Sequence, residues 1–305
     1  MAVSFDGTPV SIGLGGVETL TGSGGTYRVG DAAVFVSGNM VAAANDDGVL
    51  FTATEYVDGS GLGLGRIYPM HVHDNGDGSF ELYYQIYDAD PLPASYSNWR
   101  LTIDATTGAA VGTASEITTG AFSTTSTTML RYAASLPDGT IFIVYPGTVG
   151  GASIVDTDGN TIHALPNFGG IGTTTSGMHP VDVAVTGSNI FYTWVDSDFG
   201  EAGATMLQIY DLDGNEVLAP TEVSDAHTSA FGRPPAVRAE TLPDGRVVVV
   251  WVDSGTQSAD TDQTSTWFKI YNADGTVSVA STLVNSDVQS GRQDNPLLVV
   301  TETGF

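Results

Sequence analysis

The chain has 305 residues, of which 35 are Asp or Glu and 9 are Lys or Arg, so its formal net charge is −26. A field of this sign repels nucleic-acid phosphates and anionic lipids, so neither is an expected partner. Glycine supplies 38 residues and only 14% of residues are charged, which leaves little material for long salt-bridged helices and favours an all-β fold. Cysteine is absent, which excludes disulfides, thiolate metal sites and a cysteine nucleophile.

Neither a membrane span nor a secretory signal is expected. The longest apolar stretches, such as residues 247–252, are far shorter than the about 18 residues that cross a bilayer. The first residues, MAVSFDGTPV, contain no basic residue followed by an apolar segment. We therefore expect a soluble protein, which is either the mature chain expressed without its signal or a protein that leaves the cell by another way.

Two segments of the chain repeat one pattern. Residues 180–223 and 234–285 each contain four short runs rich in Val, Ile, Thr, Tyr and Trp, which is typical of β-strands. A D-x-D-G or N-x-D-G turn joins the third run to the fourth, and LPDG at 136–139 and 242–245 joins the first run to the second. Glycine supplies the positive φ that such hairpins need. The glycine of the third-to-fourth turn recurs at Gly7, Gly48, Gly108, Gly159, Gly214 and Gly275.

The spacing of these glycines, 41 to 61 residues, is typical of propeller blades. We predict a single β-propeller domain over residues 1–305, with six four-stranded blades. The sixth would be composite, with residues 295–304 as its first strand and the N-terminus as its third and fourth. Its second strand is missing and residues 8–40 match the pattern poorly, so five blades with an N-terminal appendage is the alternative.

A further pattern, Q-x-x-P, D-G-G-F, V-x-W and Y-x-x-x-G, is partly matched in the last two units. The matching residues are Gln293, Pro296, Gly304, Phe305, Leu242, Pro243, Asp244, Gly245, Trp251, Tyr271, Asp274 and Gly275. On these residues the chain resembles blade-like repeats of large secreted bacterial proteins of the hemolysin-type calcium-binding kind. The resemblance covers 180–305 clearly and 66–170 loosely, and it implies a propeller but no particular activity. The glycine-rich calcium-binding tail of that family is absent, so neither its calcium roll nor its export route is implied.

The long connections, from second to third strands and from one blade to the next, indicate where a binding site lies. Variable loops on a rigid scaffold concentrate binding residues, so we place any site on the face that these connections share. Half of the eight arginines lie near the start of a first strand on that face, namely Arg66, Arg131, Arg233 and Arg292. Converging guanidinium groups could hold a carboxylate or sulfate of a sugar. Alternatively, each arginine pairs with an acid of a neighbouring blade, such as Asp196 or Asp253.

Trp99 and Trp267, at the starts of third strands, are candidates for stacking on a ligand or for packing between blades. The arginine placement resembles that of sialidases, which are six-bladed propellers with an arginine cluster. The S-x-D-x-G-x-x-W turn of that family has no match here, so we assign no catalytic residue.

Metal binding has weaker signals. Two turns begin like calcium loops and are also typical hairpin turns; they contain Asp156, Asp158, Asn160, Asp211, Asp213 and Asn215. On the long-connection face, Asp260 and Asp262 are equal candidates for calcium. His71 and His73 project from one side of a strand, but no third metal ligand is apparent. We therefore predict no cofactor, with calcium as the one ion considered.

Loops rich in Thr, Ser, Gly and Asp, without cysteine or a signal, favour a non-enzymatic propeller displayed on a virion or an extracellular surface. We predict a phage virion component or bacterial adhesin that binds a cell-surface glycan or a coat or tail protein. One alternative is a glycosidase or lyase that acts on an acidic polysaccharide through the arginine face. The other is a purely structural module whose partner is another copy of itself or a neighbouring coat protein.

Overall fold

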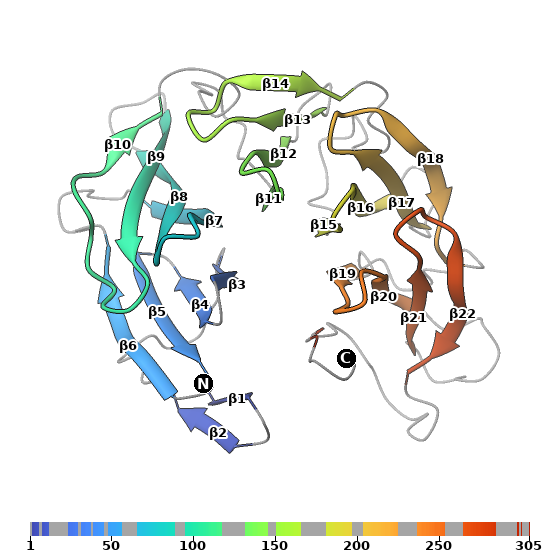
Figure 1. Ribbon diagram of the computed structural model, residues 1–305, viewed down its shortest axis with the longest axis horizontal. Coiled ribbons are helices and arrows are strands. Elements are labelled where there is room, and N and C mark those ends of the chain that lie inside the picture. Colours follow the sequence, from blue (N-terminus) through green and yellow to red (C-terminus); the bar gives the residue numbers. More distant parts are fainter. Residues whose placement is uncertain are drawn as a thin grey trace. The chain divides into compact units, whose positions relative to one another are not determined.

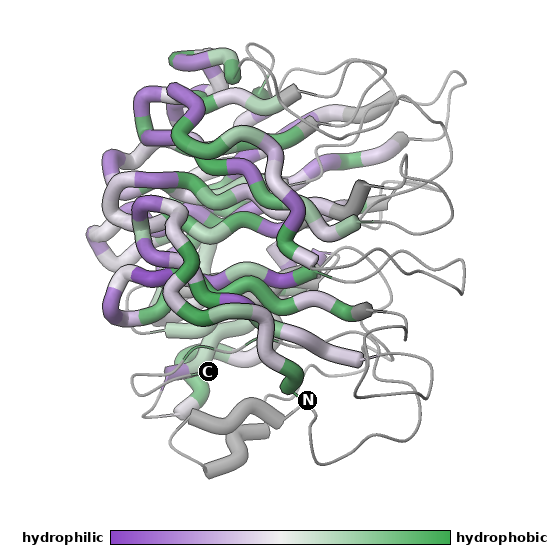
Figure 2. Tube along the Cα trace, turned by 90° about the vertical axis from the view of Figure 1, so that its right-hand side faces the viewer, coloured by the Kyte–Doolittle hydropathy of each residue, from purple (hydrophilic) through white to green (hydrophobic). Residues whose placement is uncertain are grey.

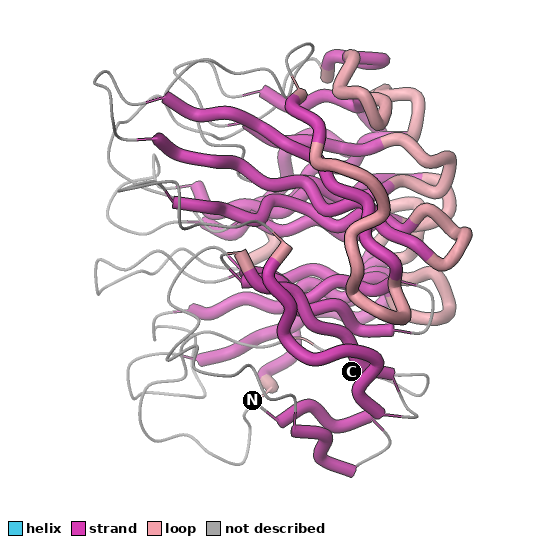
Figure 3. The backbone as a smooth tube through the Cα atoms, turned by 90° about the vertical axis from the view of Figure 1, so that its left-hand side faces the viewer, coloured by secondary structure: helices cyan, strands magenta, loops and turns pink. Residues whose placement is uncertain are grey.

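The computed structural model contains strands and loops in its described part, and no helix there could span a membrane (Figure 3). The structure describes residues 2–5, 8–11, 24–29, 32–37, 39–45, 48–56, 66–88, 95–117, 132–145, 151–165, 181–196, 204–224, 237–253, 265–284, 298, 300 and 305.

The described strands form five four-stranded antiparallel sheets and one two-stranded sheet, β1 (Ala2–Phe5) with β2 (Thr8–Ser11) (Figure 1). Each four-stranded sheet follows chain order from first to fourth strand, and we call the sheets blades 1 to 5.

Blade 1 consists of β3 (Gly24–Val29), β4 (Ala32–Ser37), β5 (Met40–Asn45) and β6 (Gly48–Glu55). Blade 2 consists of β7 (Arg66–Asp74), β8 (Ser79–Asp88), β9 (Ser95–Asp104) and β10 (Ser115–Glu116). Blade 3 consists of β11 (Tyr132–Ser135), β12 (Ile141–Tyr145), β13 (Gly151–Val155) and β14 (Thr161–Ala164). Blade 4 consists of β15 (Val181–Val185), β16 (Asn189–Asp196), β17 (Ala204–Asp211) and β18 (Glu216–Glu222). Blade 5 consists of β19 (Val237–Thr241), β20 (Val247–Asp253), β21 (Ser265–Tyr271) and β22 (Val277–Leu283).

The fold is a five-bladed β-propeller, which confirms the predicted fold class in its five-bladed alternative. The six-blade count is corrected because β1 and β2 pair with each other in a separate two-stranded sheet, as the appendage alternative predicts. Leu298, Val300 and Phe305, the described residues near the C-terminus, are not in strands. The poorly matching segment before Gly48 supplies the first three strands of blade 1.

The predicted turn glycines set the ends of the blades. Glycines with positive φ lie between the third and fourth strands of all five blades, at Gly48, Gly108, Gly159, Gly214 and Gly275. Gly7 lies outside the described residues. The LPDG turns also have a glycine with positive φ, Gly139 at 85° and Gly245 at 83°. These turns use the left-handed conformation that glycine adopts without a steric cost.

Contacts divide the chain into two compact units. Unit 1 contains residues 1–135, 139–141 and 155–161, and unit 2 contains residues 136–138, 142–154 and 162–305. Each unit is described by itself below, and the single domain over residues 1–305 stays a prediction.

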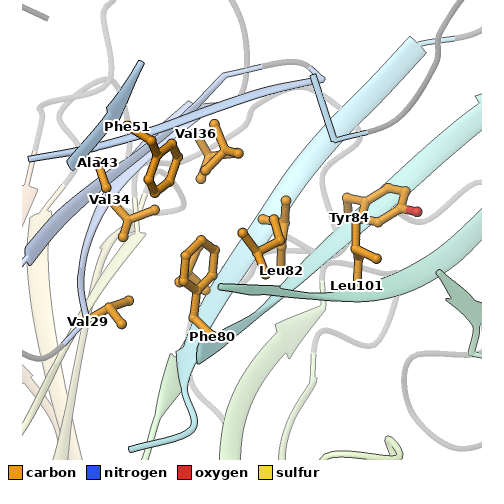
Figure 4. Packing of buried hydrophobic residues seen from close by; sticks show 12 residues of the cluster. Val29, Val34, Val36, Ala43, Phe51, Phe80, Leu82, Tyr84 and Leu101 are labelled. Atoms are coloured by element: carbon orange, nitrogen blue, oxygen red, sulfur yellow. The ribbon is translucent and has the colours of Figure 1, made fainter. Parts of the chain in front are cut away.

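In unit 1, blades 1 and 2 share a hydrophobic core. One face of blade 2, which includes Phe80 and Leu82, packs against Val34 and Phe51 of blade 1 (Figure 4). In unit 2, blades 4 and 5 pack in the same way through residues such as Phe191 and Trp251. Hydrophobic and polar residues are interspersed along the strands (Figure 2). The inner strand β20 is apolar throughout residues 247–252, and its alternate residues enter two different hydrophobic clusters, so that strand is buried on both faces. Burying each large side chain contributes roughly 2 to 3 kcal/mol.

A third-to-fourth turn closes each of these blade pairs. A Cβ atom on Gly108 of blade 2 would lie 2.5 Å from the Phe51 ring of blade 1. A Cβ atom on Gly275 of blade 5 would lie 2.6 Å from the Ile209 side chain of blade 4. These two positions therefore require glycine for two reasons: its backbone adopts a positive φ, and the lack of a side chain allows the preceding blade to approach closely.

Candidate functional site

In unit 2, the first strands of blades 4 and 5, β15 and β19, lie side by side and are joined by side chains. Each is the edge strand of its sheet, so backbone groups along it need partners from outside the sheet. The Ala239 N–H donates to a carboxylate oxygen of Asp182 over 3.0 Å. The Thr241 hydroxyl donates to the Val185 carbonyl over 2.8 Å. These bonds fix the position of β19 beside β15.

Asp182 is a buried carboxylate that holds two backbone amides. Its side chain is 8% exposed, and its second oxygen accepts a hydrogen bond from the Val183 N–H over 3.0 Å. Hydrogen bonds from backbone N–H groups stabilise the charged form of a carboxylate. Asp182 therefore supplies a fixed negative charge between the two edge strands.

Glu240 follows Ala239 on β19 and is the unusual acid of this site. Desolvation by the surrounding protein, followed by the negative charge of Asp182, raises the pKa of its carboxyl to about 7. The residue nevertheless has a large exposed surface, so solvent reaches the side chain and screens both effects in part. A glutamic acid of this kind carries a proton near neutral pH and can still meet a ligand.

The charge of Asp182 contributes to the raised pKa of Glu240, although Glu240 lies on the face of β19 opposite to Val237 and Ala239, which pack against blade 4. A raised carboxyl pKa is the means by which enzymes keep a protonated donor near neutral pH. Arg238, two residues before Glu240, lies on the same face of β19 and donates to the Val237 carbonyl over 2.9 Å. Sequence reasoning missed Asp182 and Glu240, because no motif marks either residue.

The structure describes only some of the residues that the sequence analysis places on the binding face. Arg66 begins β7, Asp196 ends β16 and Asp253 ends β20, and their side chains are not among those described. The other predicted arginines, Arg131, Arg233 and Arg292, lie outside the described residues. An arginine cluster on one face therefore stays a prediction.

Trp99 and Trp267 have the same environment in blades 2 and 5. Each is partly buried against the core of its unit, and each indole N–H donates over 2.8 Å to the serine two residues earlier, Ser97 or Ser265. Packing between blades is thus observed for both residues. Stacking on a ligand stays a prediction.

The ion pair between neighbouring blades is formed by an arginine that the sequence analysis did not select. Arg100 of β9 pairs with Asp158 in the third-to-fourth turn of blade 3 over 2.8 Å, and also donates to the Thr157 carbonyl over 2.8 Å. An equivalent turn carbonyl, that of Ala273 in blade 5, accepts a hydrogen bond from Asn189 of blade 4 over 2.6 Å.

The two acidic turns considered for calcium are occupied by their own hydrogen bonds. Asp156 accepts from the backbone and the side chain of Asn160, over 2.8 and 2.9 Å, and Asp211 accepts likewise from Asn215. Asp260 and Asp262 lie outside the described residues. Within the described part of the chain, no three His, Cys, Asp or Glu side chains gather as a metal site would require.

Comparisons with known proteins identify the fold. No protein-family model matches the sequence, and no curated protein does. Among solved structures, an α-L-arabinofuranosidase from Lactobacillus brevis is similar at a TM-score of 0.51 and 11% identity, over 91% of this chain and 96% of that one. A luciferin-regenerating enzyme (TM-score 0.47, 11% identity, 89% and 80% covered) and an α-L-arabinanase from Cellvibrio cellulosa (0.42, 11%, 85% and 94%) also match.

These comparisons correct the main functional prediction. The prediction of a non-enzymatic virion component or adhesin is contradicted, because the similar solved structure with a TM-score above 0.5 is an α-L-arabinofuranosidase by name. The alternative of a carbohydrate-active enzyme agrees better with them. Of the two resemblances, only the coarser statement, a β-propeller, is confirmed; no finding supports likeness to hemolysin-type repeats or to sialidases.

Proposed function

We propose that the chain is a glycoside hydrolase in which Glu240 is the general acid. The observation that carries this proposal is the exposed Glu240 carboxyl on the edge strand β19, whose pKa is raised to about 7 by burial and, second, by the charge of Asp182. Glycosidases need a carboxylic acid that is still protonated at the working pH. The likeness to solved structures supports the scaffold alone.

Glu240 would act on the leaving group. Cleavage of a glycosidic bond passes through an oxocarbenium-like transition state, and an acid protonates the departing oxygen as the bond breaks. Asp182 is a positioning residue, because it is buried and its oxygens hold the Ala239 and Val183 amides. Its charge adds to the effect of burial, which is the larger cause of the raised pKa of Glu240. We assign no base to activate the attacking water.

The proposed substrate is a neutral glycoside. A chain with a net charge of −26 repels a polyanion over long distances, which disfavours the acidic polysaccharide named in the sequence-based alternative. The sugar to test first is an α-L-arabinofuranoside, after the activity in the name of the similar Lactobacillus brevis enzyme.

The test measures kcat/KM on 4-nitrophenyl α-L-arabinofuranoside and on arabino-oligosaccharides, with a sialoside and a polyuronate as acidic counterparts. We expect turnover of a neutral substrate, and a loss of about 100-fold or more on the oligosaccharides in Glu240→Gln. Glu116→Gln, on the exposed strand β10, is the matched control and should keep full activity. Turnover of no glycoside, or equal activity in both variants, would refute the proposal. Turnover of the acidic substrates alone would refute the neutral assignment.

A further inference from the structure

Blade 2 has a polar face opposite the face that packs on blade 1. The sheet register places His73 opposite Glu81 and His71 opposite Tyr83, so these four side chains lie on one face. Val72 and Leu82 point the other way, into the core of unit 1. His71 and His73 are 4% and 6% exposed. This face of blade 2 therefore buries polar side chains, whereas its opposite face, packed on blade 1, buries apolar ones.

Ser135, the last residue of β11 in blade 3, lies between the two imidazoles. Its hydroxyl oxygen is 2.7 Å from Nδ1 of His73 and 2.9 Å from Nε2 of His71. A hydroxyl has a single proton, so it donates to one ring nitrogen and accepts from an N–H of the other ring. All three residues belong to unit 1.

Both imidazoles are neutral at physiological pH. Burial and, second, the nearby His73 lower the pKa of His71 to about 3, although a hydrogen bond to the Ala133 backbone acts in the opposite direction. Burial also lowers the pKa of His73, while the charges of Glu81 and Asp74 act in the opposite direction. His73 is therefore uncharged, and the carboxylates of Glu81 and Asp74 stabilise the imidazolium that forms when it accepts a proton.

We infer that Ser135 is the nucleophile of a second site, with His73 as its general base, which cleaves esters of short acyl groups. A hydroxyl within hydrogen-bond reach of a neutral imidazole, itself near a carboxylate, is the arrangement that activates serine. This role requires the tautomer of His71 with its proton on Nε2, which then donates to the Ser135 oxygen and turns the serine proton toward His73. The substrate acyl group is short, because both imidazoles that contact the half-buried hydroxyl are themselves buried.

The chemistry balances without a cofactor. The Ser135 proton passes to Nδ1 of His73 while the serine oxygen bonds to the acyl carbon. The ester C–O bond then breaks, and the alcohol leaves with the proton from His73. Water next attacks the acyl-serine and gives a proton to His73, which returns it to the serine oxygen as the free acid departs.

This site is independent of the glycosidase proposal and is tested separately. The folded protein is treated with a fluorophosphonate probe, and its peptides are analysed by mass spectrometry; hydrolysis of 4-nitrophenyl acetate is measured in parallel. We expect an adduct on Ser135 that is lost in urea, together with ester turnover that Ser135→Ala abolishes. His73→Gln should slow both reactions by about 100-fold or more.

Ser79→Ala is the matched control, because Ser79 is also half-buried but its hydroxyl donates to Asp77 over 2.6 Å instead of contacting an imidazole. It should leave labelling and turnover unchanged. The adduct is mapped on the unaltered chain, so the test holds even where a variant does not fold. Absence of a Ser135 adduct, equal labelling in urea, or unchanged turnover in Ser135→Ala would overturn the inference.

Discussion

The carboxylate of Asp182 accepts the backbone N–H of Ala239 over 3.0 Å, and the next residue along that strand is Glu240. One hydrogen bond thus joins two blades and fixes a negative charge near the acid proposed for catalysis. Because the bond is made to the backbone, the position of the charge does not depend on the Glu240 side chain.

Replacing Asp182 by Asn should shift the pH dependence of glycoside hydrolysis. The charge of Asp182 raises the pKa of Glu240, so its loss lowers that pKa toward the ordinary value for glutamate. The alkaline limb of the kcat/KM profile, which the proposal places near pH 7 for the unaltered chain, should move to lower pH by the part of the shift that Asp182 contributes. A limb that stays in place would show that Asp182 does not act on the general acid.

Two glycines of blade 5 offer a matched test of the joints between blades. Gly245 and Gly275 have φ values of 83° and 84°, but a Cβ atom meets nothing within 4 Å at Gly245 and lies 2.6 Å from Ile209 at Gly275. Gly245→Ala should lower the free energy of unfolding by about 1 to 2 kcal/mol, from backbone strain alone. Gly275→Ala should cost more, and urea unfolding measures the difference. Equal losses would mean that the close approach of blade 4 is unimportant.

Much of the fold could be predicted, because turn chemistry is local. A tight hairpin demands a glycine with positive φ, and the glycines at 108, 159, 214 and 275 mark the ends of third strands as expected. The closing of the propeller could not be predicted in the same way. Whether β1 and β2 complete a blade depends on strands distant in the chain, which no turn residue specifies.

The candidate sites could not be predicted from the sequence for a similar reason. The pKa of Glu240 depends on a carboxylate from another blade, and the reactivity inferred for Ser135 depends on two histidines of blade 2. The spacing of His71 and His73 places both on one side of a strand, but nothing in the sequence marks Ser135 as the partner that they share. Arginine scarcity drew attention to Arg66 and its counterparts, whereas the observed ion pair between blades uses Arg100.

Acid should destabilise the protein through His71. Its pKa is about 3 in the folded state against 6.5 in the unfolded chain, so the unfolded state binds more protons below pH 6.5 and stability falls as the pH decreases. Between pH 6.5 and 5 this histidine should remove about 2 kcal/mol from the free energy of unfolding. Urea unfolding of the unaltered chain and of His71→Gln at both pH values isolates the effect. The same loss in both proteins would contradict it.

Trp267 gives a way to separate packing from ligand binding. Trp267→Phe removes the indole N–H that donates to Ser265 and part of the area packed on the core of unit 2. We expect a loss of about 1 to 2 kcal/mol in the free energy of unfolding, with KM for the glycoside unchanged. A raised KM with unchanged stability would instead support the predicted stacking on a sugar.

The role of Glu240 is tested most directly by the leaving group. The measurement compares Glu240→Gln with the unaltered chain on a 2,4-dinitrophenyl glycoside, whose leaving group needs no proton, and on an oligosaccharide of the same sugar, whose leaving group does. Our account predicts that the variant keeps most of its activity on the dinitrophenyl substrate and loses about 100-fold or more on the oligosaccharide. Equal losses on both substrates would contradict a general acid at Glu240.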